Sequence, residues 1–446
     1  MEFFIGLDIG TTAIKGVLMS AEGRIIKTVS GGYNYYCEGD KKLLKPADFI
    51  GTCFSVISSL ASYKGDGGIK AICSCCASGN LILLDNDDKP VTPIVGWQTT
   101  VSEEDKNAFF TPEEQAAFYK TVGWPLGSRF PALYLAAINL HEPKLLKQTK
   151  TVAMSAEYLN FMLTGKWGIS VSMGTPSFLM DQEKGEYNYP LLKKLGIADK
   201  CLPPVYDKGT VLGGVLPEVA KKLNLSDDTK VVLGSFDHPS GATGAGVFGE
   251  NEMLLSCGTS WVEFFPVKSR EFAVSTRGLI DRFMINGTPY CVMKSITSVS
   301  EKIDALRRHF FGEISHKEFD TLAARASLGC GGLRFDFSSD DDYKKAFAYA
   351  GSDIARAIIE SAAYILKENL ETLEKCGLKA KKITMIGGIS NSADCVRIIS
   401  EVLDMPVKVV NGQCAGAVGS ALLAGIGAGV YKDEKDAFSR FEVTNK

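Results

Sequence analysis

The sequence predicts an α/β protein made of two related halves, and two observations lead to this prediction. Short apolar strands alternate with amphipathic helices along the 446 residues. In addition, one pattern (strand, Gly, Thr, a hydroxyl residue, strand) occurs around Gly10 and again around Gly258. This recurrence indicates an internal duplication with a boundary near residues 247–249. At roughly 150 residues per domain, the chain length also favours two or three domains.

The first half is expected to open with three short strands joined by tight turns. The predicted strands cover residues 3–7, 13–20, 24–29, 70–76, 81–85 and 230–234. The predicted helices cover residues 46–63, 103–119, 131–140 and 156–163.

The second half is expected to be richer in helix. Strands are predicted at 253–257, 261–265, 382–386 and 407–410, and helices at 297–311, 317–326, 352–376 and 393–403. The apolar run 415–431 is rich in glycine and close to the lower length limit for a membrane span. It is interpreted as a buried helix packed through its glycines.

The composition excludes several classes of protein. Hydrophobic residues make up 45% and charged residues 23%, which is ordinary for a globular chain. With 49 Lys and Arg against 52 Asp and Glu, there is no basic excess for nucleic-acid binding. Glu2 stands where a signal peptide would be positive, and the 12 cysteines lack disulfide-scaffold spacing. We therefore expect a cytoplasmic protein that binds neither nucleic acid nor membrane, with Cys73, Cys75 and Cys76 as small buried residues.

The first candidate site is the segment Asp8-Ile9-Gly10-Thr11-Thr12, which follows a predicted strand. Glycine lets a backbone approach phosphate oxygens, while turn N–H groups and hydroxyls donate to them. A carboxylate beside them suits Mg²⁺, which keeps several waters and binds through one or two carboxylates. An Asx-type turn in a plain hairpin would explain the same residues.

Two further turns could bind other parts of a nucleotide. Gly258-Thr259-Ser260 offers the same donors without the acid, although a hairpin turn also explains it. Gly387-Gly388-Ile389-Ser390-Asn391 lies between a predicted strand and a predicted helix, and paired glycines allow a flat group such as adenine to lie on the backbone. The alternative is a tight turn with Ser392 as helix N-cap.

Asp237 follows the strand at 230–234, at a strand-to-helix junction. A carboxylate there can take a proton from an attacking hydroxyl, or it can cap the helix. His238 could donate to a substrate oxygen or serve as a surface or capping residue. The glycines 244, 246 and 249 match a dinucleotide-binding pattern literally, but they lie too far past the strand, and close helix packing explains them better.

Taken together, these motifs resemble those of the FGGY family of carbohydrate kinases, and the resemblance covers nearly the whole chain. The similar segments are residues 5–15, 234–246, 256–260 and 385–391, with Ile389 where a third glycine is common. The resemblance implies two actin-like (ribonuclease H-like) domains with mixed β-sheets, flanking helices and a cleft between them. It implies an N-terminal domain of residues 1–247 with the phosphate turn and sugar pocket, and a C-terminal domain of residues 248–446 with the second phosphate turn and adenosine site.

The resemblance also assigns roles to particular residues. It implies that Asp237 is the catalytic base and that Asp8 and Asp237 are the metal residues. The implied ATP-binding residues are Gly10, Thr11, Thr12, Lys15, Gly258, Thr259, Ser260, Gly387, Gly388 and Asn391. The implied substrate residues are Ser78, Trp97, Gln98, Asp237 and His238.

The implied sugar pocket departs from the family pattern. Ala77-Ser78-Gly79 stands where family members often carry Gln-Met-His, and Thr99 replaces the acid of a Trp-x-Asp-x-Arg motif. Another sugar-contacting acid is replaced near Met173. Loss of polar partners changes which hydroxyl pattern is accepted. The segment around Gly123 and 163–181 resembles the deoxyketose kinases.

The function expected from this resemblance is that of an ATP-dependent carbohydrate kinase with Mg²⁺. Its substrate would be a small ketose or deoxyketose of the xylulose, ribulose, fuculose or rhamnulose kind, and a homodimer is an option. The alternative is a non-catalytic, actin-like nucleotide-binding regulator, which the altered pocket motivates and the retention of Asp8 and Asp237 opposes. A nicotinamide oxidoreductase would rest only on the displaced glycine pattern.

Overall fold

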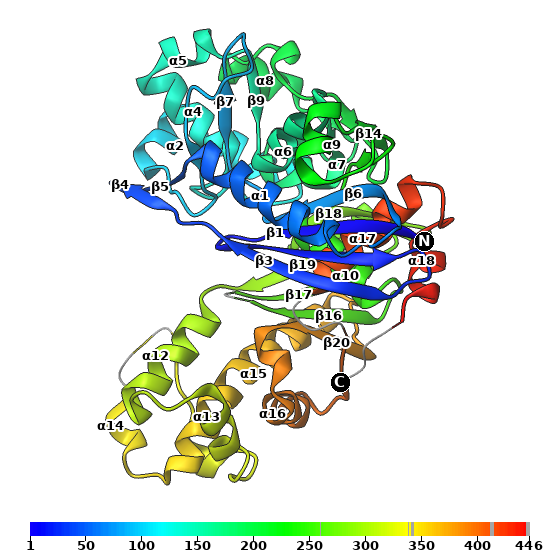
Figure 1. Cartoon of the computed structure of the whole chain (residues 1–446). Coiled ribbons are helices and arrows are strands. Elements are labelled where there is room, and N and C mark those ends of the chain that lie inside the picture. Colours follow the sequence, from blue (N-terminus) through cyan, green and yellow to red (C-terminus); the bar gives the residue numbers. More distant parts are fainter. Residues whose placement is uncertain (259, 338, 340–342, 411–413, 443–446) are drawn as a thin grey trace. The chain divides into compact units, whose positions relative to one another are not determined.

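The chain forms two compact units in a computed structural model that describes residues 1–258, 260–337, 339, 343–410 and 414–442 (Figure 1). Unit 1 comprises Met1–Gly246, Leu279–Ile285 and Gly416–Glu442, and unit 2 comprises Val247–Gly278 and Asn286–Ala415. The predicted second domain, 248–446, differs from unit 2, because two of its segments lie in unit 1. The segment Gly416–Glu442 lies in unit 1 because its helix packs directly against the first strand of the chain. The two backbones are so close that a side chain at Gly6 would overlap the carbonyl oxygen of Ala417. The cleft that the resemblance implies between the two domains stays a prediction.

The sheet of unit 1 has the strand order β14-β15-β6-β1-β2-β3. The strands are β1 (Glu2–Ile9), β2 (Ala13–Ser20), β3 (Ile25–Gly32), β6 (Gly68–Cys76), β14 (Val211–Gly214) and β15 (Lys230–Val232). β1 is parallel to β6, and β6 is parallel to β15, whereas β2, β3 and β14 run antiparallel to their neighbours. The carboxyl ends of β1, β6 and β15 therefore lie at one edge of the sheet.

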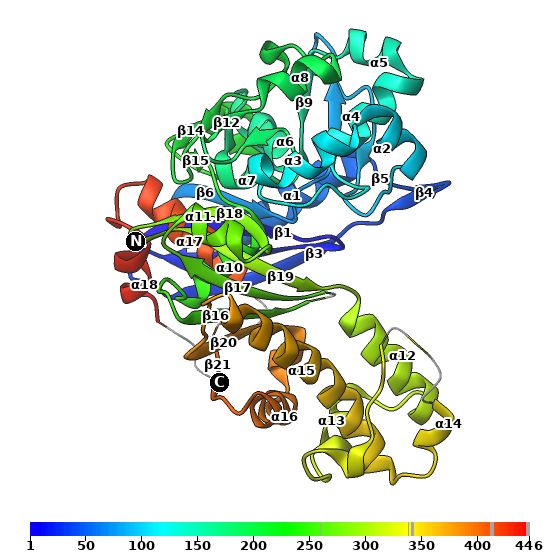
Figure 2. The same ribbon diagram turned by 180° about the vertical axis from the view of Figure 1, so that it is seen from behind.

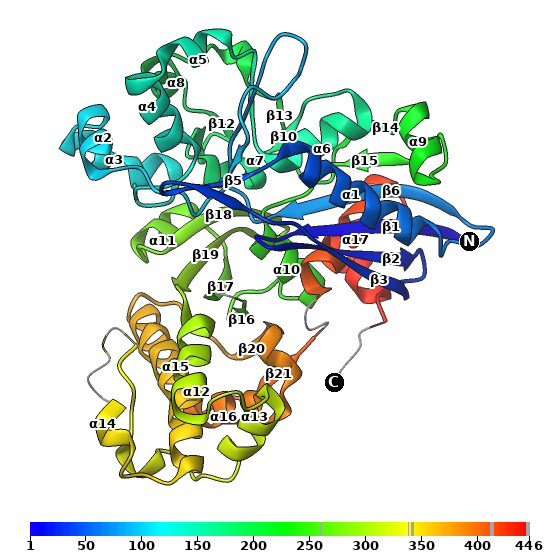
Figure 3. The ribbon, with the colours of Figure 1, turned by 60° about the vertical axis from the view of Figure 1, so that its left-hand side comes forward.

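Alternate residues of β1 face different helices, as expected for a strand buried on both faces. The position of a side chain at Gly6 meets α17 (Ala415–Gly427). Leu7, one residue on, lies near Gly16 on the side where Val56 and Leu60 of α1 (Pro46–Ala61) pack. The two helices thus cover opposite faces of the sheet (Figure 3).

The remaining elements of unit 1 are helices and short strands, most of them inserted between β6 and β15. β4 and β5 precede β6, α10 follows β15, and α18 is near the C-terminal end of the unit. The helices are α2 (Glu103–Phe109), α3 (Pro112–Val122), α4 (Pro131–His141), α5 (Pro143–Gln148), α6 (Ser155–Thr164), α7 (Val171–Gly174), α8 (Tyr189–Leu195), α9 (Pro217–Leu223), α10 (Asp237–Ala245) and α18 (Glu434–Arg440). The short strands are β4 (Tyr36–Glu38), β5 (Lys41–Leu44), β7 (Ile82–Leu84), β8 (Ile94–Val95), β9 (Thr151–Ala153), β10 (Ile169–Ser170), β11 (Met180–Asp181), β12 (Glu186–Tyr187) and β13 (Val205–Tyr206). The strand β18 (Leu279–Ile285) belongs to this unit as well.

In unit 2, five strands take the order β19-β17-β16-β20-β21. They are β16 (Glu252–Cys257), β17 (Trp261–Val267), β19 (Thr288–Ile296), β20 (Lys382–Gly387) and β21 (Val407–Val409). The helices are α11 (Arg270–Ser275), α12 (Val299–Phe311), α13 (His316–Ala323), α14 (Tyr343–Ala346), α15 (Gly351–Lys375) and α16 (Ala393–Leu403). Figure 2 shows α12 and α13 grouped with the long α15.

The two sheets repeat one arrangement, which confirms that the halves are related. In each unit, three consecutive antiparallel strands are followed by two further strands that are parallel to the first. The order β3-β2-β1-β6-β15 of unit 1 matches β19-β17-β16-β20-β21 of unit 2, strand for strand. The recurring Gly-Thr turn connects the first two strands in each case, so the repeat seen in the sequence corresponds to a repeat in topology.

The predicted elements agree with the structure in most places, and one helix prediction was wrong. The run 103–119 is two helices, α2 and α3, because Thr111 begins a new one. Its hydroxyl accepts from the Glu114 N–H while Glu114 accepts from the Thr111 N–H, and Pro112 takes the first helical position. The spacing of apolar residues continues without interruption across this break, so the sequence pattern did not reveal that the helix ends there.

Unit 2 contains a buried acid without hydrogen-bond partners. Glu263 in β17 is fully buried, and among the described residues neither of its carboxylate oxygens has a partner. Burial raises the pKa of Glu263 from 4.5 to about 8, and the opposing effects of Lys294 and Asn369 lower it only in part. A carboxyl group with a raised pKa in the folded state favours folding below its unfolded pKa and ceases to do so as the pH rises through the folded value.

We expect Glu263→Gln to raise the free energy of unfolding at pH 9 by about 1–3 kcal/mol, because it removes a buried charge. At pH 5, where the native carboxyl group is already protonated, the two proteins should differ by less than about 1 kcal/mol. Urea denaturation at both pH values measures this difference. A gain in stability that is the same at both pH values would contradict a buried titrating group.

Candidate active site

The predicted phosphate turn of unit 1 lies at the carboxyl end of β1. The N–H of Gly10 donates to the Ala13 carbonyl (3.1 Å), and the Gly10 carbonyl accepts from the Tyr33 hydroxyl. The Thr11 hydroxyl accepts from the indole Nε1 of Trp97 (3.1 Å), so Trp97 contacts the turn directly. Thr12 is exposed. Lys15 lies opposite Asp8 on the antiparallel strand β2.

Asp8 lies two residues before Gly10, and its carboxylate is enclosed on two sides. Oδ1 accepts a weak hydrogen bond from the Cys75 thiol (3.7 Å) on the neighbouring strand β6. A side chain at Gly416, in the first turn of α17, would come within 2.8 Å of Oδ2. The helix backbone can therefore approach this carboxylate only because residue 416 has no side chain.

Asp237 is the first residue of α10, one position past the N-cap. Its Oδ1 accepts from the His238 N–H (2.8 Å), and its side chain is 26% exposed, so a substrate can reach it. An isolated bridge between Phe236 and Cys76 places the start of α10 beside the end of β6. Asp8 and Asp237 thus stand at the same edge of the unit 1 sheet, where parallel strands end.

The electrostatics of the two carboxylates show that they interact. Burial, followed by repulsion from Asp237, raises the pKa of Asp8 from 3.8 to about 6, and Lys15 opposes the shift. Burial raises the pKa of Asp237, while His238 opposes that shift. Two acids that are costly to ionise together are typical of sites that bind a cation or move a proton.

Hydrogen bonds between α10 and α17 support the Asp8 side of the site. Ser240 in α10 donates to the Gly416 carbonyl (2.9 Å), and Ser420 in α17 donates to the Leu7 carbonyl (3.1 Å). A side chain at Gly419 would lie 2.0 Å from the Ser240 carbonyl oxygen and 3.0 Å from the Gly244 nitrogen. Close packing of α10 and α17 therefore explains Gly244, and Gly246 is close to the Phe438 ring of α18, as the helix-packing interpretation predicted. A side chain at Gly249 would meet only the Glu252 side chain, so helix packing does not explain this glycine.

The predicted sugar residues occupy different environments. The Ser78 hydroxyl is buried and donates to the Met173 carbonyl (3.0 Å) and to Met154 Sδ (3.1 Å). Thr99 is also buried, and its hydroxyl bonds to the backbone of Lys42. Trp97 and Gln98 are half-buried, and the Arg129 guanidinium lies 5.8 Å from the Trp97 ring. The His238 ring packs edge-on against Phe236.

Gly79 and Phe130 together change the shape of the implied pocket. Gly79 has a φ of +91°, and a side chain there would come within 2.5 Å of the Phe130 ring. Phe130 itself has a φ of +82°, which is rare for an aromatic residue and indicates that its surroundings hold it in place. An aromatic ring, in contact with Trp124 and Phe178, thus lies where a side chain at residue 79 would project.

In unit 2, the second phosphate turn and the predicted adenosine segment lie at neighbouring strand ends. Cys257, which ends β16, pairs in register with Gly387, which ends the parallel strand β20. Gly387 has a φ of +101°, and a side chain there would lie 2.2 Å from the Cys257 carbonyl oxygen. Gly388 is exposed, and none of the atoms that the structure describes lies within 4 Å of the place of a side chain there.

The other predicted residues of unit 2 lie in these two segments. The Gly258 N–H donates to the Ser260 carbonyl (3.1 Å), which closes the turn. Thr259 lies outside the described residues. Asn391 is exposed, and Ser392 caps α16 by accepting from the Cys395 N–H, as the turn interpretation predicted. In unit 2, the segments around Gly258 and Gly387 thus lie at neighbouring strand ends, whereas in unit 1 the predicted sugar residues have different partners.

Sequence reasoning missed three supporting groups of this site. Cys75 was interpreted as a small buried residue, which is correct, but its thiol also contacts Asp8. Gly416 lies in a glycine-rich segment that fits the family pattern, but neither it nor Ser240 was predicted to contact Asp8 or its helix. Only the register of β6 against β1 and the crossing of α10 and α17 bring these groups to Asp8.

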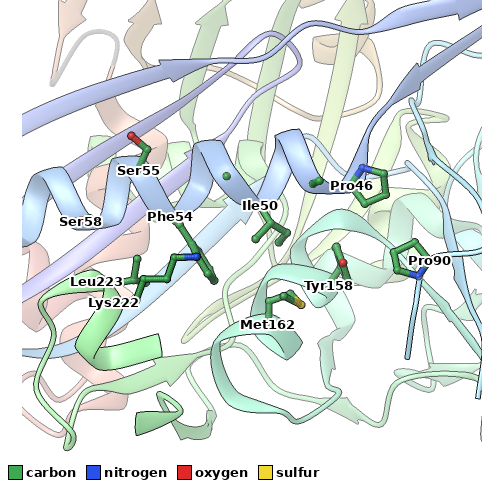
Figure 4. Close-up of a pocket in the computed structure, with 12 residues that line it drawn as sticks. Pro46, Ile50, Phe54, Ser55, Ser58, Pro90, Tyr158, Met162, Lys222 and Leu223 are labelled. Atoms are coloured by element: carbon green, nitrogen blue, oxygen red, sulfur yellow. The ribbon is translucent and has the colours of Figure 1, made fainter. Parts of the chain in front are cut away.

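Other features of the chain lie away from these residues. An apolar groove between α1, α6 and α9, lined by Ile50, Phe54, Tyr158, Met162 and Leu223 among others, includes none of the predicted site residues (Figure 4).

Within the described ranges, no three His, Cys, Asp or Glu side chains come together as metal ligands. No described helix is both long and apolar enough to cross a membrane.

Comparison with known proteins identifies the family. The N-terminal domain of the FGGY family of carbohydrate kinases matches residues 3–244, and the C-terminal domain matches residues 349–428. The chain therefore belongs to the FGGY family of carbohydrate kinases, as the sequence motifs predicted. Its enzyme class is that of the family, a phosphotransferase with an alcohol group as acceptor.

Individual relatives span nearly the whole chain. A xylulose kinase of Staphylococcus epidermidis is 24% identical over 457 residues, which cover 99% of this chain and 91% of the relative. The crystal structure of a ligand-bound xylulose kinase from Lactobacillus acidophilus superposes with a TM-score of 0.89 at 21% identity, covering 100% of this chain and 93% of that one. A gluconate kinase from the same organism gives 0.88 at 22% identity, covering 100% and 92%. These likenesses confirm the fold predicted from the sequence, that of the actin-like sugar kinases.

We expect Gly416→Ala to displace the Asp8 carboxylate, because the added methyl group would lie 2.8 Å from Oδ2. Sugar-dependent ADP release should fall about 10-fold or more, since small displacements of reacting groups are costly. Gly51→Ala is the matched control, because it lies in α1 with open space around it and should keep full turnover. Unchanged turnover in Gly416→Ala would show that this contact does not hold Asp8.

Proposed function

We propose that this kinase transfers the γ-phosphoryl group of ATP to a hydroxyl group of a small ketose or deoxyketose, with Asp237 as the base. The observation that carries the proposal is the pair Asp8 and Asp237 at one sheet edge, beside the Gly10–Thr12 turn. Both acids have a raised pKa, and both lie at the edge where parallel strands end, Asp8 near the end of β1 and Asp237 after β15. Ligands of open α/β sheets bind at that edge.

The base role follows from how Asp237 is held. The His238 N–H fixes Oδ1, which leaves Oδ2 as the oxygen that takes the proton from the sugar hydroxyl. The raised pKa brings the carboxylate closer to the affinity for protons that a general base needs near neutral pH. The N-terminus of α10 stabilises the negative charge before the transfer.

The donor set fits Mg²⁺. Asp8 and Asp237 repel each other, which a cation would relieve, and Mg²⁺ is commonly held by one or two carboxylates together with substrate phosphates. When bound, the ion neutralises charge that develops on the phosphates. Asp8 would hold it, with Gly416 leaving room at Oδ2.

The two glycine turns would bind the phosphates of ATP. The Gly10–Thr12 turn offers backbone N–H groups and two hydroxyls, and Lys15 adds a positive charge near Asp8. The turn at Gly258 and Ser260 offers similar donors in unit 2, with Thr259 between them. The adenosine would rest near Gly387, Gly388 and Asn391, where the open surface of Gly388 accepts a flat ring. Positioning and charge neutralisation supply most of the catalysis in phosphoryl transfer.

The pocket favours a substrate with few hydroxyl groups at one end. Ala77 has an apolar side chain, the Ser78 hydroxyl is already bonded to Met173, and Gly79 is covered by Phe130. None of these three residues therefore offers a spare side-chain donor, unlike the polar triplet common in the family. The xylulose kinases among the relatives support a ketose, and the aromatic surface supports a deoxygenated end.

A non-catalytic nucleotide-binding regulator is not favoured. Such a protein has no need for a partly exposed acid at residue 237, and the relatives that span the chain are named as kinases. The cytoplasmic location and the homodimer stay predictions.

Replacement of Asp237 by Ala is expected to lower kcat by about 10²–10⁴-fold, the usual contribution of a positioned base. ATP should still bind, because the glycine turns are unchanged. In the unmodified enzyme, kcat/KM should fall as the pH drops through the raised pKa of Asp237, at a pH above the ordinary value of 3.8. Coupled ADP detection measures both, and a variant with unaltered kcat would remove Asp237 from the mechanism.

A panel of ketoses, deoxyketoses and polyols with Mg²⁺ and ATP tests the substrate class. We expect ADP release with one or more ketoses, and a kcat/KM for 6-deoxyketoses at least equal to that for their hydroxylated counterparts. Phe130→Ala should reduce this preference for the deoxy compound. If ATP binds but no compound in the panel stimulates ADP release, the regulator alternative is favoured instead.

A further inference from the structure

A short segment of the chain is built into unit 1 although its neighbours in sequence belong to unit 2. Residues 279–285 form β18, between Gly278 and Asn286 of unit 2. The Ile280 N–H donates to the Gly123 carbonyl (3.0 Å). The Ile280 carbonyl accepts from Trp124 Nε1 (2.9 Å) and Gln182 Nε2 (2.6 Å). Three hydrogen bonds at one residue hold this segment firmly in unit 1.

The next residue of this segment, Asp281, is fully buried, and both of its carboxylate oxygens are bonded. Oδ2 accepts from the Ser172 hydroxyl (2.7 Å), and Oδ1 accepts from the Arg282 N–H (2.7 Å). Burial raises the pKa of Asp281 from 3.8 to about 7, and the hydrogen bonds from Ser172, Thr175 and the Arg282 N–H oppose this shift only in part. The positive charge of Lys208, itself paired with Glu434 at 2.8 Å, opposes it least. Such an acid is costly to bury and requires an explanation beyond packing.

Ser172 links Asp281 to the connection that carries Asp237. Its oxygen accepts from the Phe236 N–H (3.2 Å), and Phe236 is the N-cap residue directly before Asp237. A serine hydroxyl has one hydrogen and two acceptor sites. Because Asp281 takes the hydrogen, a lone pair of the oxygen is directed at Phe236. Nearby, Ser170 donates to the Gly234 carbonyl (2.6 Å), so both ends of the segment 234–236 are tied to the 170–172 region.

A second line of contacts reaches the same residue. Trp124, which donates to Ile280, packs edge-on against the Phe236 ring at 5.9 Å between centroids. Phe236 in turn packs edge-on against His238 at 5.3 Å. The backbone of Phe236 and its ring are therefore both held from β18, one through Ser172 and the other through Trp124.

We propose that Asp281 and Ser172 are positioning residues for the catalytic base. Asp281 orients the Ser172 hydroxyl, the hydroxyl fixes the Phe236 N–H, and this fixes the start of α10 and the direction of the Asp237 carboxylate. The inference rests on the proposed role of Asp237. A base must be held within a fraction of an ångström of its productive position, which justifies a buried acid that never touches the substrate.

The first test uses Ser172→Ala, Asp281→Ala and Asp281→Asn. With Mg²⁺, ATP and xylulose, or whichever ketose the panel identifies, kcat should fall about 10–100-fold in the two Ala variants, while KM for sugar and for ATP stays within about threefold. Asp281→Asn keeps an oxygen that can accept from Ser172 and should retain more turnover than Asp281→Ala.

The matched control is Ser177→Ala. Ser177 is a buried serine a few residues away that donates to the Gly174 carbonyl (2.6 Å) and accepts from the Leu179 N–H (3.1 Å). Neither of these hydrogen bonds involves the 234–236 segment, and the variant should keep kcat within about twofold. An equal loss of kcat in this control would show a general effect of packing and would overturn the proposal.

A double-mutant cycle shows whether Ser172 acts through Asp237. In an Asp237→Asn background, adding Ser172→Ala should change the residual kcat by less than about twofold, because a positioning residue has no further effect once its base is gone. If the two losses multiply, Ser172 acts elsewhere and the proposal is wrong.

Hydrogen exchange gives a readout that does not depend on activity. The peptide containing residues 234–240 should exchange faster in Ser172→Ala and Asp281→Ala than in the wild type or in Ser177→Ala, because the Phe236 N–H loses its oriented acceptor. Unchanged exchange refutes the positioning role. Faster exchange combined with a fully active Asp237→Ala variant would instead refute the proposed base.

Discussion

The placement of two carboxylates at the buried edge of one sheet is the constraint on which the rest of the site depends. Asp8 and Asp237 are both partly removed from water, and the cost appears as a raised pKa for each. The surrounding structure bears this cost through close backbone approach at Gly416 and through the hydrogen bonds of Ser240 and Ser420. A site that is unfavourable when empty in this way is favourable for a bound cation, because the ion removes the repulsion.

The strand pattern explains why this edge can be assembled from distant parts of the chain. Parallel strands β1, β6 and β15 end at the same edge, so Gly10, Ala77 and Asp237 become neighbours across more than two hundred residues. In unit 2 the same rule brings Gly258 beside Gly387 through the pairing of β16 with β20. Strand direction thus places the candidate site residues, and in the inserted layer the Phe130 ring covers Gly79.

The sequence predicted the strands and helices of both sheets well, because their apolar periods are strong and their turns carry glycine. It predicted the site residues as separate motifs, and their order indicated the family. It did not predict Cys75, Gly416, Ser172 or Asp281 as parts of the site, since their roles come from strand register and helix crossing rather than from local pattern. Strands β18 and β19 were also missed, although Asn286-Gly287 between them is a strong turn signal. The break at Thr111 was hidden by a continuous apolar period.

The two repeats differ at the residue two positions before the glycine of the turn, and this difference bears on the direction in which a nucleotide would bind. By strand position, Ser256 in β16 corresponds to Asp8 in β1, since each lies two residues before the glycine of its turn. Two equivalent glycine turns alone would let a polyphosphate chain bind in either sense. A carboxylate in one half and a neutral hydroxyl in its counterpart break that pseudosymmetry, so under the proposed function a metal-bound phosphate would be held in the half that carries Asp8. The pair Asp8 and Ser256 is thus a difference within the repeated scaffold that would set the direction of the transfer.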